Sequence, residues 1–277
     1  MIVTVPTEIR FDHYGRYVLP HPETATEQSW TRATTLAKAI SDDWALKAWE
    51  GRMVASGLAR RPDLIALAAA TPIPVRGQDG YTEGKRTLNE IVGRAKEAAK
   101  SSAGANIGSA LHAATASLDR GEEVTLPEPY QADLEIYRQT LWDQRIDVLE
   151  IEQIVVLPSL GVAGTFDRIV SLPDVGPAIA DLKTGSVEYS WLEISIQLAL
   201  YAHASHIWRA DRREYDPAPA VNQARALVIH LPAGEARCDL YSVDIASGWE
   251  AAQLCGQIRD WRGRKNLARP AQLKGAP

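Results

Sequence analysis

Apolar residues recur at helical spacing through the first half of the chain, which predicts a segment that is almost entirely helical up to about residue 147. Leu36, Ile40, Trp44 and Ala48 follow one another every four residues, and this stripe predicts a long helix over residues 34–57. Four further helices are expected over residues 62–70, 84–100, 103–119 and 129–145. The last of these is expected to bury Trp142 with its other apolar residues.

Near Val148 the pattern changes to short runs rich in β-branched residues, which are typical of strands. Helices are expected over residues 190–208 and 247–263, the second with Ser247 as its N-cap. Strands are expected over residues 149–157, 164–172, 178–183, 226–231 and 238–245. This order predicts an α/β (α+β) protein with a mixed central β-sheet flanked by helices. Residues 1–100 are expected to form an N-terminal helical subdomain, and residues 101–277 the core.

The composition is that of an ordinary globular protein and excludes a disordered chain, because 45% of the 277 residues are hydrophobic and 23% are charged. The formal net charge of −5 excludes a protein whose whole surface attracts phosphate, but it allows a local basic groove. Cys238 and Cys255 are too few for a disulfide framework, so we expect a cytoplasmic protein. The first ten residues lack the apolar run of a signal peptide, and no run approaches the roughly 20 apolar residues of a membrane span.

The candidate chemistry lies on two of the expected strands. Asp181 and Lys183 are two residues apart, so their side chains point to one face of a strand. Asp167 lies on the preceding strand of a predicted hairpin and can sit opposite Asp181. Two neighbouring carboxylates repel unless a cation lies between them, and their oxygens suit Mg²⁺ or Mn²⁺. The alternative is an exposed hairpin with an ordinary ion pair.

Further polar residues follow in a fixed order along the chain. His112 lies on an expected helix, and Gln197 and Tyr201 lie on one face of another. Together with the segments Gly164-Thr-Phe-Asp167 and Asp181-Leu-Lys183-Thr-Gly185, this set resembles the RecB-like branch of the PD-(D/E)XK nuclease superfamily. The resemblance covers roughly residues 106–245 and implies a restriction-endonuclease-like core.

The resemblance also implies a role for each matching residue. Asp167 and Asp181 look like the carboxylates that bind Mg²⁺ or Mn²⁺, with His112 and the Leu182 carbonyl as further metal ligands. Lys183 looks like the catalytic lysine. Gln197 and Tyr201 look like the helix motif that positions the site. Several relatives carry four cysteines for an iron–sulfur cluster, and with two late, widely spaced cysteines no such cluster is expected in this chain.

The function implied is that of a divalent-metal-dependent DNA exonuclease, of phage or bacterial type, in recombination, repair or replication. The expected partner is DNA with single- or double-stranded ends, and a recombinase or a single-strand-binding protein is a further candidate; no membrane partner is expected. The N-terminal helical segment would cover the site. A DNA endonuclease with the same metal site, and a non-catalytic DNA-binding protein on a nuclease fold, remain alternatives.

Binding to DNA would have to be local. The candidate contacts are three basic stretches, and each is equally explained as a solvated surface: residues 85–100, residues 209–213, and the C-terminal Arg259, Arg262, Arg264, Lys265, Arg269 and Lys274. Glu152 is a possible further site carboxylate, although an ordinary strand-end glutamate is the simpler interpretation. His203 and His206 are not expected to be ligands.

Overall fold

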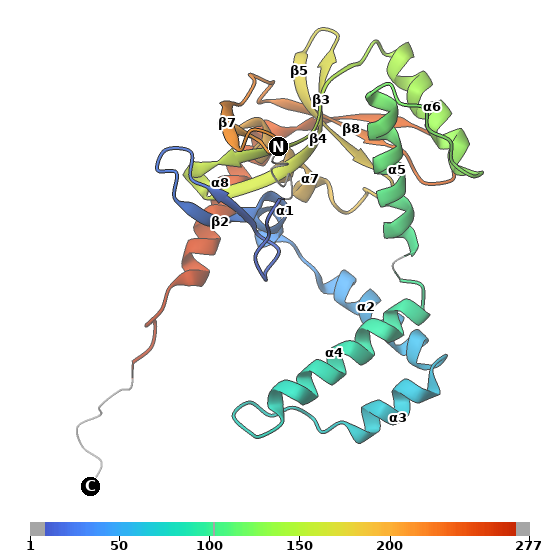
Figure 1. The fold of residues 1–277 in the computed structure, drawn as a ribbon, viewed down its shortest axis with the longest axis vertical. Helices are drawn as coiled ribbons and strands as arrows, with labels where there is room; N and C mark the ends of the chain where they lie inside the picture. The colour runs from blue at the N-terminus through green and yellow to red at the C-terminus, as the bar shows by residue number, and fades with distance from the viewer. Residues whose placement is uncertain (1–8, 102, 270–277) are drawn as a thin grey trace, which may run out of the picture. The chain divides into compact units, whose positions relative to one another are not determined.

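The computed structural model describes residues 9–101 and 103–269 and has a mixed α/β architecture (Figure 1). Contacts divide the chain into two compact units. The first unit comprises Met1–Ser41 and Ala114–Pro277, and the second comprises Asp42–Ala113. The segment 1–100 expected as one helical subdomain is thus divided between the two units.

The first unit is built on a sheet in which the described residues form nine strands, with β7-β6-β3-β4-β5-β8-β9 as the main path. Two N-terminal strands, β1 and β2, join it through β4. The strands are β1 (Tyr17–Pro20), β2 (Glu27–Arg32), β3 (Asp147–Leu157), β4 (Val162–Leu172), β5 (Gly176–Lys183), β6 (His206–Arg209), β7 (Glu214–Pro217), β8 (Arg225–His230) and β9 (Asp239–Asp244).

One edge of β4 is shared by two strands. Because β3 pairs with β4 along nearly its whole length, β5 and β2 must both pair on the opposite edge. β5 runs antiparallel there over residues 168–172, while β2 runs parallel at Val162 and Ala163. Among the described strands, none pairs with residues 164–167 on that edge. The sheet therefore opens at the Gly164–Asp167 segment.

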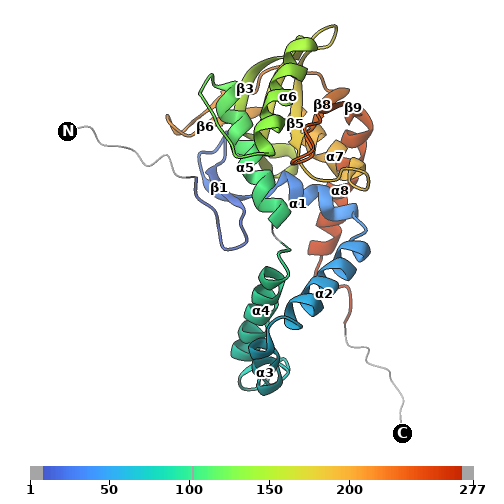
Figure 2. The same cartoon turned by 90° about the vertical axis from the view of Figure 1, so that its right-hand side faces the viewer.

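Helices cover both faces of this sheet. On one face, α1 (Ala33–Ala37), α7 (Trp191–Ala202) and α8 (Ile245–Gly263) share a buried apolar cluster with the strands, and Figure 2 shows these helices on the same side. On the other face, α6 (Tyr130–Asp143) packs over a second cluster with β5 and β8. A short 3₁₀ helix, η1 (Lys38–Ile40), directly continues α1.

The second unit contains α2 (Trp44–Leu58), α3 (Pro62–Ala70) and α4 (Tyr81–Ala98), and α5 (Ala103–Asp119) runs across the unit boundary. Its buried apolar cluster is small and consists of Leu64, Ile91 and Ala95. α2 and α4 approach closely at Gly57, where a Cβ atom would lie 1.8 Å from the carbonyl oxygen of Ala95.

The prediction of an almost wholly helical N-terminal half is wrong at two places. The expected helix over residues 34–57 is interrupted, because Ser41 is extended and Asp42 Oδ1 accepts a hydrogen bond from the Trp44 amide, which starts a new helix. The β1–β2 hairpin that precedes it is absent from the expected elements. Its hydrogen bonds are made between strands, so a local apolar period carries no signal for it.

Three corrections apply to the second half. The helix expected over residues 190–208 ends at Ala202. Ile207 instead lies in β6 and pairs with Val155 of β3, so that β6 and β7 are additional strands. Trp142, expected to be buried, is 80% exposed. The N-cap of α8 is Asp244, whose side chain accepts a hydrogen bond from the Ser247 amide. Ser247 therefore donates to the cap.

None of the helices within residues 9–101 and 103–269 combines the length and the apolar composition that a crossing of a bilayer requires.

Candidate active site

The opening between β4 and β5 is bridged by a carboxylate. Asp167 Oδ2 accepts a hydrogen bond of 2.9 Å from the main-chain amide of Leu182, just beyond the last paired residues, Arg168 and Ala180. The side chain of Asp167 thus takes the place of a ladder hydrogen bond. It is thereby held beside Asp181, the neighbour of Leu182 on β5.

Asp181 is a buried carboxylate whose Oδ2 atom is held by an ion pair. Only 3% of the residue is exposed. The ammonium of Lys183 lies 2.5 Å from Oδ2 as an ion pair, which confirms that the two side chains share a face of β5. Burial, followed by the charge of Asp167, raises the pKa of Asp181 to about 7, although Lys183 lowers it. Such a carboxylate needs a proton or a cation beside it.

Gln197 connects this carboxylate to α7. Its Nε2 atom lies 3.5 Å from Asp181 Oδ1 and 3.2 Å from Tyr201 Oη, and it donates to both. Burial, together with the charges of Asp181 and Asp167, raises the pKa of Tyr201, so its hydroxyl stays protonated. The four-residue spacing of the two side chains on α7 therefore fixes an amide against the site.

Tyr201 also accounts for the glycine in the Gly164-Thr-Phe-Asp167 segment. A Cβ atom on Gly164 would lie 2.6 Å from Tyr201 Cε1 and 3.1 Å from Ala33 Cβ. A methyl group cannot be accommodated there without displacing a buried aromatic ring. The glycine of the Gly164-Thr-Phe-Asp167 segment therefore packs directly against Tyr201 of α7.

A cavity of about 260 Å³ opens beside these residues. Lys183 and Gln197 line it, together with Lys38 from η1 and with Ser190 and Glu193 at the start of α7. Lys183 remains partly accessible, with 28% of its side chain exposed. The ammonium that pairs with Asp181 is thus also the group that faces a ligand entering this cavity.

The donor set fits a divalent cation with an incomplete protein shell. Asp167 and Asp181 supply carboxylates, and Asp181 Oδ2 has the Lys183 ammonium as its ion-pair partner. Over residues 9–101 and 103–269, no group of three or more His, Cys, Asp or Glu side chains is arranged to hold a metal. Mg²⁺ is commonly bound by one or two carboxylates with water completing the shell, so two carboxylates suffice. The Leu182 carbonyl as a ligand stays a prediction.

His112 lies on α5 and is half-buried, in the part of the helix that belongs to the second unit. Its role as a metal ligand stays a prediction, as do the catalytic roles of Lys183, Gln197 and Tyr201.

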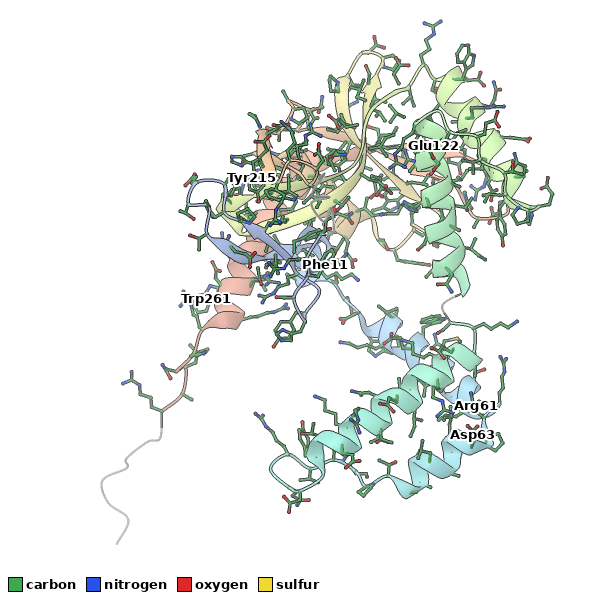
Figure 3. All side chains as sticks on the ribbon, viewed as in Figure 1. Phe11, Arg61, Asp63, Glu122, Tyr215 and Trp261 are labelled. Carbon is green, nitrogen blue, oxygen red and sulfur yellow. The ribbon has the colours of Figure 1, made fainter. Side chains whose placement is uncertain are left out.

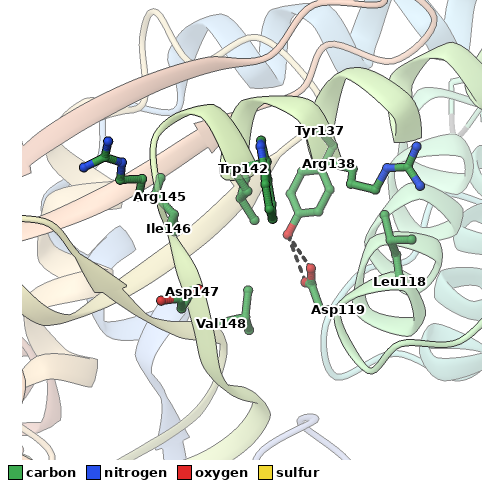
Figure 4. A pocket seen from close by; sticks show the side chains of 10 residues that line it. Leu118, Asp119, Tyr137, Arg138, Trp142, Arg145, Ile146, Asp147 and Val148 are labelled. Atoms are coloured by element: carbon green, nitrogen blue, oxygen red, sulfur yellow. Dashed lines mark hydrogen bonds between the residues drawn. The ribbon is translucent and has the colours of Figure 1, made fainter.

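On the opposite side of β4, a second charged cluster is closed by its own partners. Arg168 is 1% exposed, and its guanidinium donates to Asp119 Oδ2 at 2.5 Å and to Thr115 Oγ1 at 2.8 Å. The Tyr137 hydroxyl donates to both oxygens of Asp119, as Figure 4 shows. Burial lowers the pKa of Arg168, but Tyr137 and Asp119 raise it above its ordinary value. Burial also raises the pKa of Asp119, against the opposing effect of Arg168.

The remaining candidates have structural partners. Glu152 forms an ion pair with Arg120 at 3.0 Å, which supports the ordinary strand-end interpretation. His203 stacks on Trp249 with ring centroids 4.0 Å apart, and its Nδ1 lies 3.0 Å from the Ala199 carbonyl oxygen. His206 lies 2.7 Å from the hydroxyl of the adjacent serine.

Much of the basic charge is also engaged. In the C-terminal stretch, Arg259 donates to the Thr31 hydroxyl and Arg262 to the Ala39 carbonyl, so both fasten α8 to the N-terminal segment. Arg264 lies over the ring of Trp261, at the exposed end of α8 (Figure 3). In the other two stretches, Arg94 pairs with Asp63, and Arg209 pairs with Glu150 and Asp216. Lys274 lies outside the described residues.

Lys38 is a residue of the site that sequence reasoning does not find. The apolar pattern places it within a long helix, where no motif distinguishes it. It reaches the cavity only because β2 pairs with β4 and thereby brings α1 and η1 against α7. No local pattern predicts that contact.

The chain matches no model of a known protein family, and no curated protein is significantly similar to it.

Proposed function

We propose that this protein is a divalent-metal-dependent nuclease that hydrolyses phosphodiester bonds in DNA, as an exonuclease of the RecB-like type. The observation that carries the proposal is the buried Asp181, which lies beside Asp167 and pairs through Oδ2 with Lys183 at the rim of a cavity. Perturbed carboxylates in a cleft with a specific charged partner are typical of functional sites. Recombination, repair or replication of phage or bacterial DNA is the setting that the resemblance implies.

In this proposal each residue has one task. Asp167 and Asp181 would hold Mg²⁺ or Mn²⁺, and such an ion, when bound, supplies positive charge against the phosphate and lowers the pKa of water. Lys183 faces the cavity, where its ammonium can hold a proton near the attacking water or offset charge that develops on the phosphate. Gln197 and Tyr201 act by positioning Asp181.

The test is a time course on end-labelled single- and double-stranded DNA with Mg²⁺ or Mn²⁺ at fixed salt. Asp181→Ala and Lys183→Ala should each abolish cleavage while the circular dichroism spectrum stays unchanged. Asp147→Asn, which changes an exposed carboxylate at the start of β3, is the matched control and should cleave at the wild-type rate.

A folded Asp181→Ala or Lys183→Ala protein that degrades DNA as fast as the wild type would refute the proposal. A covalently closed circular substrate distinguishes the two nuclease alternatives, since an exonuclease leaves it intact and an endonuclease opens it. DNA binding without cleavage in either metal would favour the non-catalytic alternative.

A further inference from the structure

The cavity beside Lys183 contains a second cation that the proposed chemistry does not use. Lys38 lines this cavity, and among the described residues its ammonium has no ion-pair partner. The only carboxylate among the lining residues is Glu193. With Lys183 already held by Asp181, Lys38 is the lysine of this cavity whose charge is free for a ligand.

The main chain that carries Lys38 is rigidly held. The neighbouring Leu36, Ala37 and Ala39 are buried in the cluster that α1 shares with α7 and α8. Arg262, reaching from α8, donates to the Ala39 carbonyl at 3.1 Å. A charged group held in place before its ligand arrives binds at lower entropic cost than a mobile one.

Other residues that line the cavity are also suited to an anion. Ser190 is the N-cap of α7, and its side chain makes no capping hydrogen bond. The first amides of a helix are unpaired donors at the positive end of its dipole. Ser190 lines the cavity together with Thr34 and Ser186, which add hydroxyl groups. Ammonium, hydroxyl and amide groups together are the donors that bind phosphate.

The size of the cavity limits what it can hold. Pockets that enclose a small molecule usually measure about 300–1,000 Å³. At about 260 Å³, this cavity falls below that range and has room for a phosphodiester group with water. A base attached to that phosphate would have to remain outside the lysine-lined space, where no base edge is read.

We propose that Lys38 binds a backbone phosphate of the substrate strand next to the bond to be cleaved, so that the site holds nucleic acid by its phosphates without reading its sequence. This inference rests on the proposed function and extends it to the substrate contact. Lys38 acts as a binding residue, and the reacting groups remain those on β4 and β5.

The test compares Lys38→Gln and Lys38→Arg with the control Arg225→Gln, which removes an exposed positive charge of the same unit outside this cavity and outside the three basic stretches. Binding of single-stranded oligonucleotides is measured by fluorescence anisotropy without divalent metal, at several salt concentrations. Lys38→Gln should weaken binding about tenfold and reduce the slope of log K against log salt by about 0.7. The same factor should appear for oligonucleotides of different base composition, and Lys38→Arg should restore most of the affinity.

Steady-state cleavage supplies the second readout. Lys38→Gln should raise KM with kcat within about twofold, because the contact is made equally before and during reaction. Inorganic phosphate, tested without metal, should raise the melting temperature of the wild type and not that of Lys38→Gln.

If the wild type cleaves DNA and Lys38→Gln changes neither KM nor the salt slope, this inference fails and the proposed function stands. An equal loss in Arg225→Gln also overturns it, since the effect would then be one of general charge. If the wild type neither binds nor cleaves nucleic acid, the proposed function fails, and with it the assignment of a substrate strand to Lys38.

Discussion

Two neighbouring residues of β4, Asp167 and Arg168, take part in charged clusters of opposite design. Arg168 belongs to a closed network in which Asp119 accepts from Arg168 and from the Tyr137 hydroxyl. Asp167 belongs to an open one, since the nearby Asp181 pairs with Lys183, which is partly exposed and lines a cavity. Buried polar groups are almost always hydrogen-bonded when their role is structural. The difference therefore distinguishes a fully enclosed cluster from one that a ligand can reach.

The two clusters also differ in charge balance. In the closed cluster one carboxylate meets one guanidinium, and Thr115 takes a further donor of that guanidinium. In the open cluster the buried Asp181 pairs with Lys183, which also lines the cavity, and the charge of Asp167 acts against that of Asp181. A divalent cation would offset the repulsion between these two carboxylates.

The largest expected effect comes from breaking the closed cluster. Arg168→Met should lower the free energy of unfolding by about 3–5 kcal/mol, because it leaves the buried Asp119 carboxylate without its cation. Urea denaturation followed by circular dichroism measures this loss. Arg209→Met is the control, since Arg209 pairs with Glu150 and Asp216 where solvent reaches all three side chains, and it should cost less than about 1 kcal/mol.

The double variant Arg168→Met/Asp119→Leu sharpens the interpretation. Removing both charges should recover part of the loss, since no uncompensated charge remains buried. Equal costs for Arg168→Met and Arg209→Met would mean that the closed cluster carries no special weight.

The open cluster should reveal itself through the pH dependence of stability. The pKa of Asp181 is raised from 3.8 to about 7 by burial and Asp167, so the folded state holds a proton that the unfolded state releases at lower pH. In a chelating buffer, the stabilisation from this proton is complete below about pH 4 and is lost as the pH rises through 7. Melting temperatures from pH 5 to pH 8 measure the decline, which should be shallower in Asp181→Asn.

Metal should reverse that decline. At pH 8, Mg²⁺ or Mn²⁺ at 100 times its dissociation constant should stabilise the wild type by about 2.7 kcal/mol and should leave Asp181→Asn unchanged. A parallel pH dependence in the two proteins, with the same response to metal, would show that Asp181 is not the titrating group and not a ligand.

Sequence reasoning succeeds where the determinants are local. The helices over residues 62–70 and 103–119 have the predicted bounds, since their apolar period is uninterrupted. The shared face of Asp181 and Lys183 follows from strand geometry alone and is confirmed by their ion pair. The misses share a different cause: the β1–β2 hairpin, β6 and the contact of Lys38 with the cavity depend on pairing between distant segments. The chemistry assigned to the site stays a prediction, because residue types do not by themselves identify a substrate.

The smallest expected effect tests how the fold holds the open cluster together. Gly164→Ala should cost about 1–3 kcal/mol, because its methyl group would lie 2.6 Å from Tyr201 Cε1. Displacing Tyr201 also moves Gln197, which contacts Asp181. The cleavage rate of the folded variant should therefore fall as well as its free energy of unfolding. Gly185→Ala is the control, since a Cβ atom there meets nothing within 4 Å and should change unfolding by less than about 0.5 kcal/mol.

A double-mutant cycle identifies the ring as the cause. In a Tyr201→Ala background the obstructing ring is gone, so Gly164→Ala should cost much less than it does in the wild type. If the cost of Gly164→Ala is the same in both backgrounds, the glycine is required for its backbone and not for the packing of Tyr201. The Gly164-Thr-Phe-Asp167 segment and the Gln197–Tyr201 pair would then occur together for some cause other than the direct contact of glycine and ring across the open edge of β4.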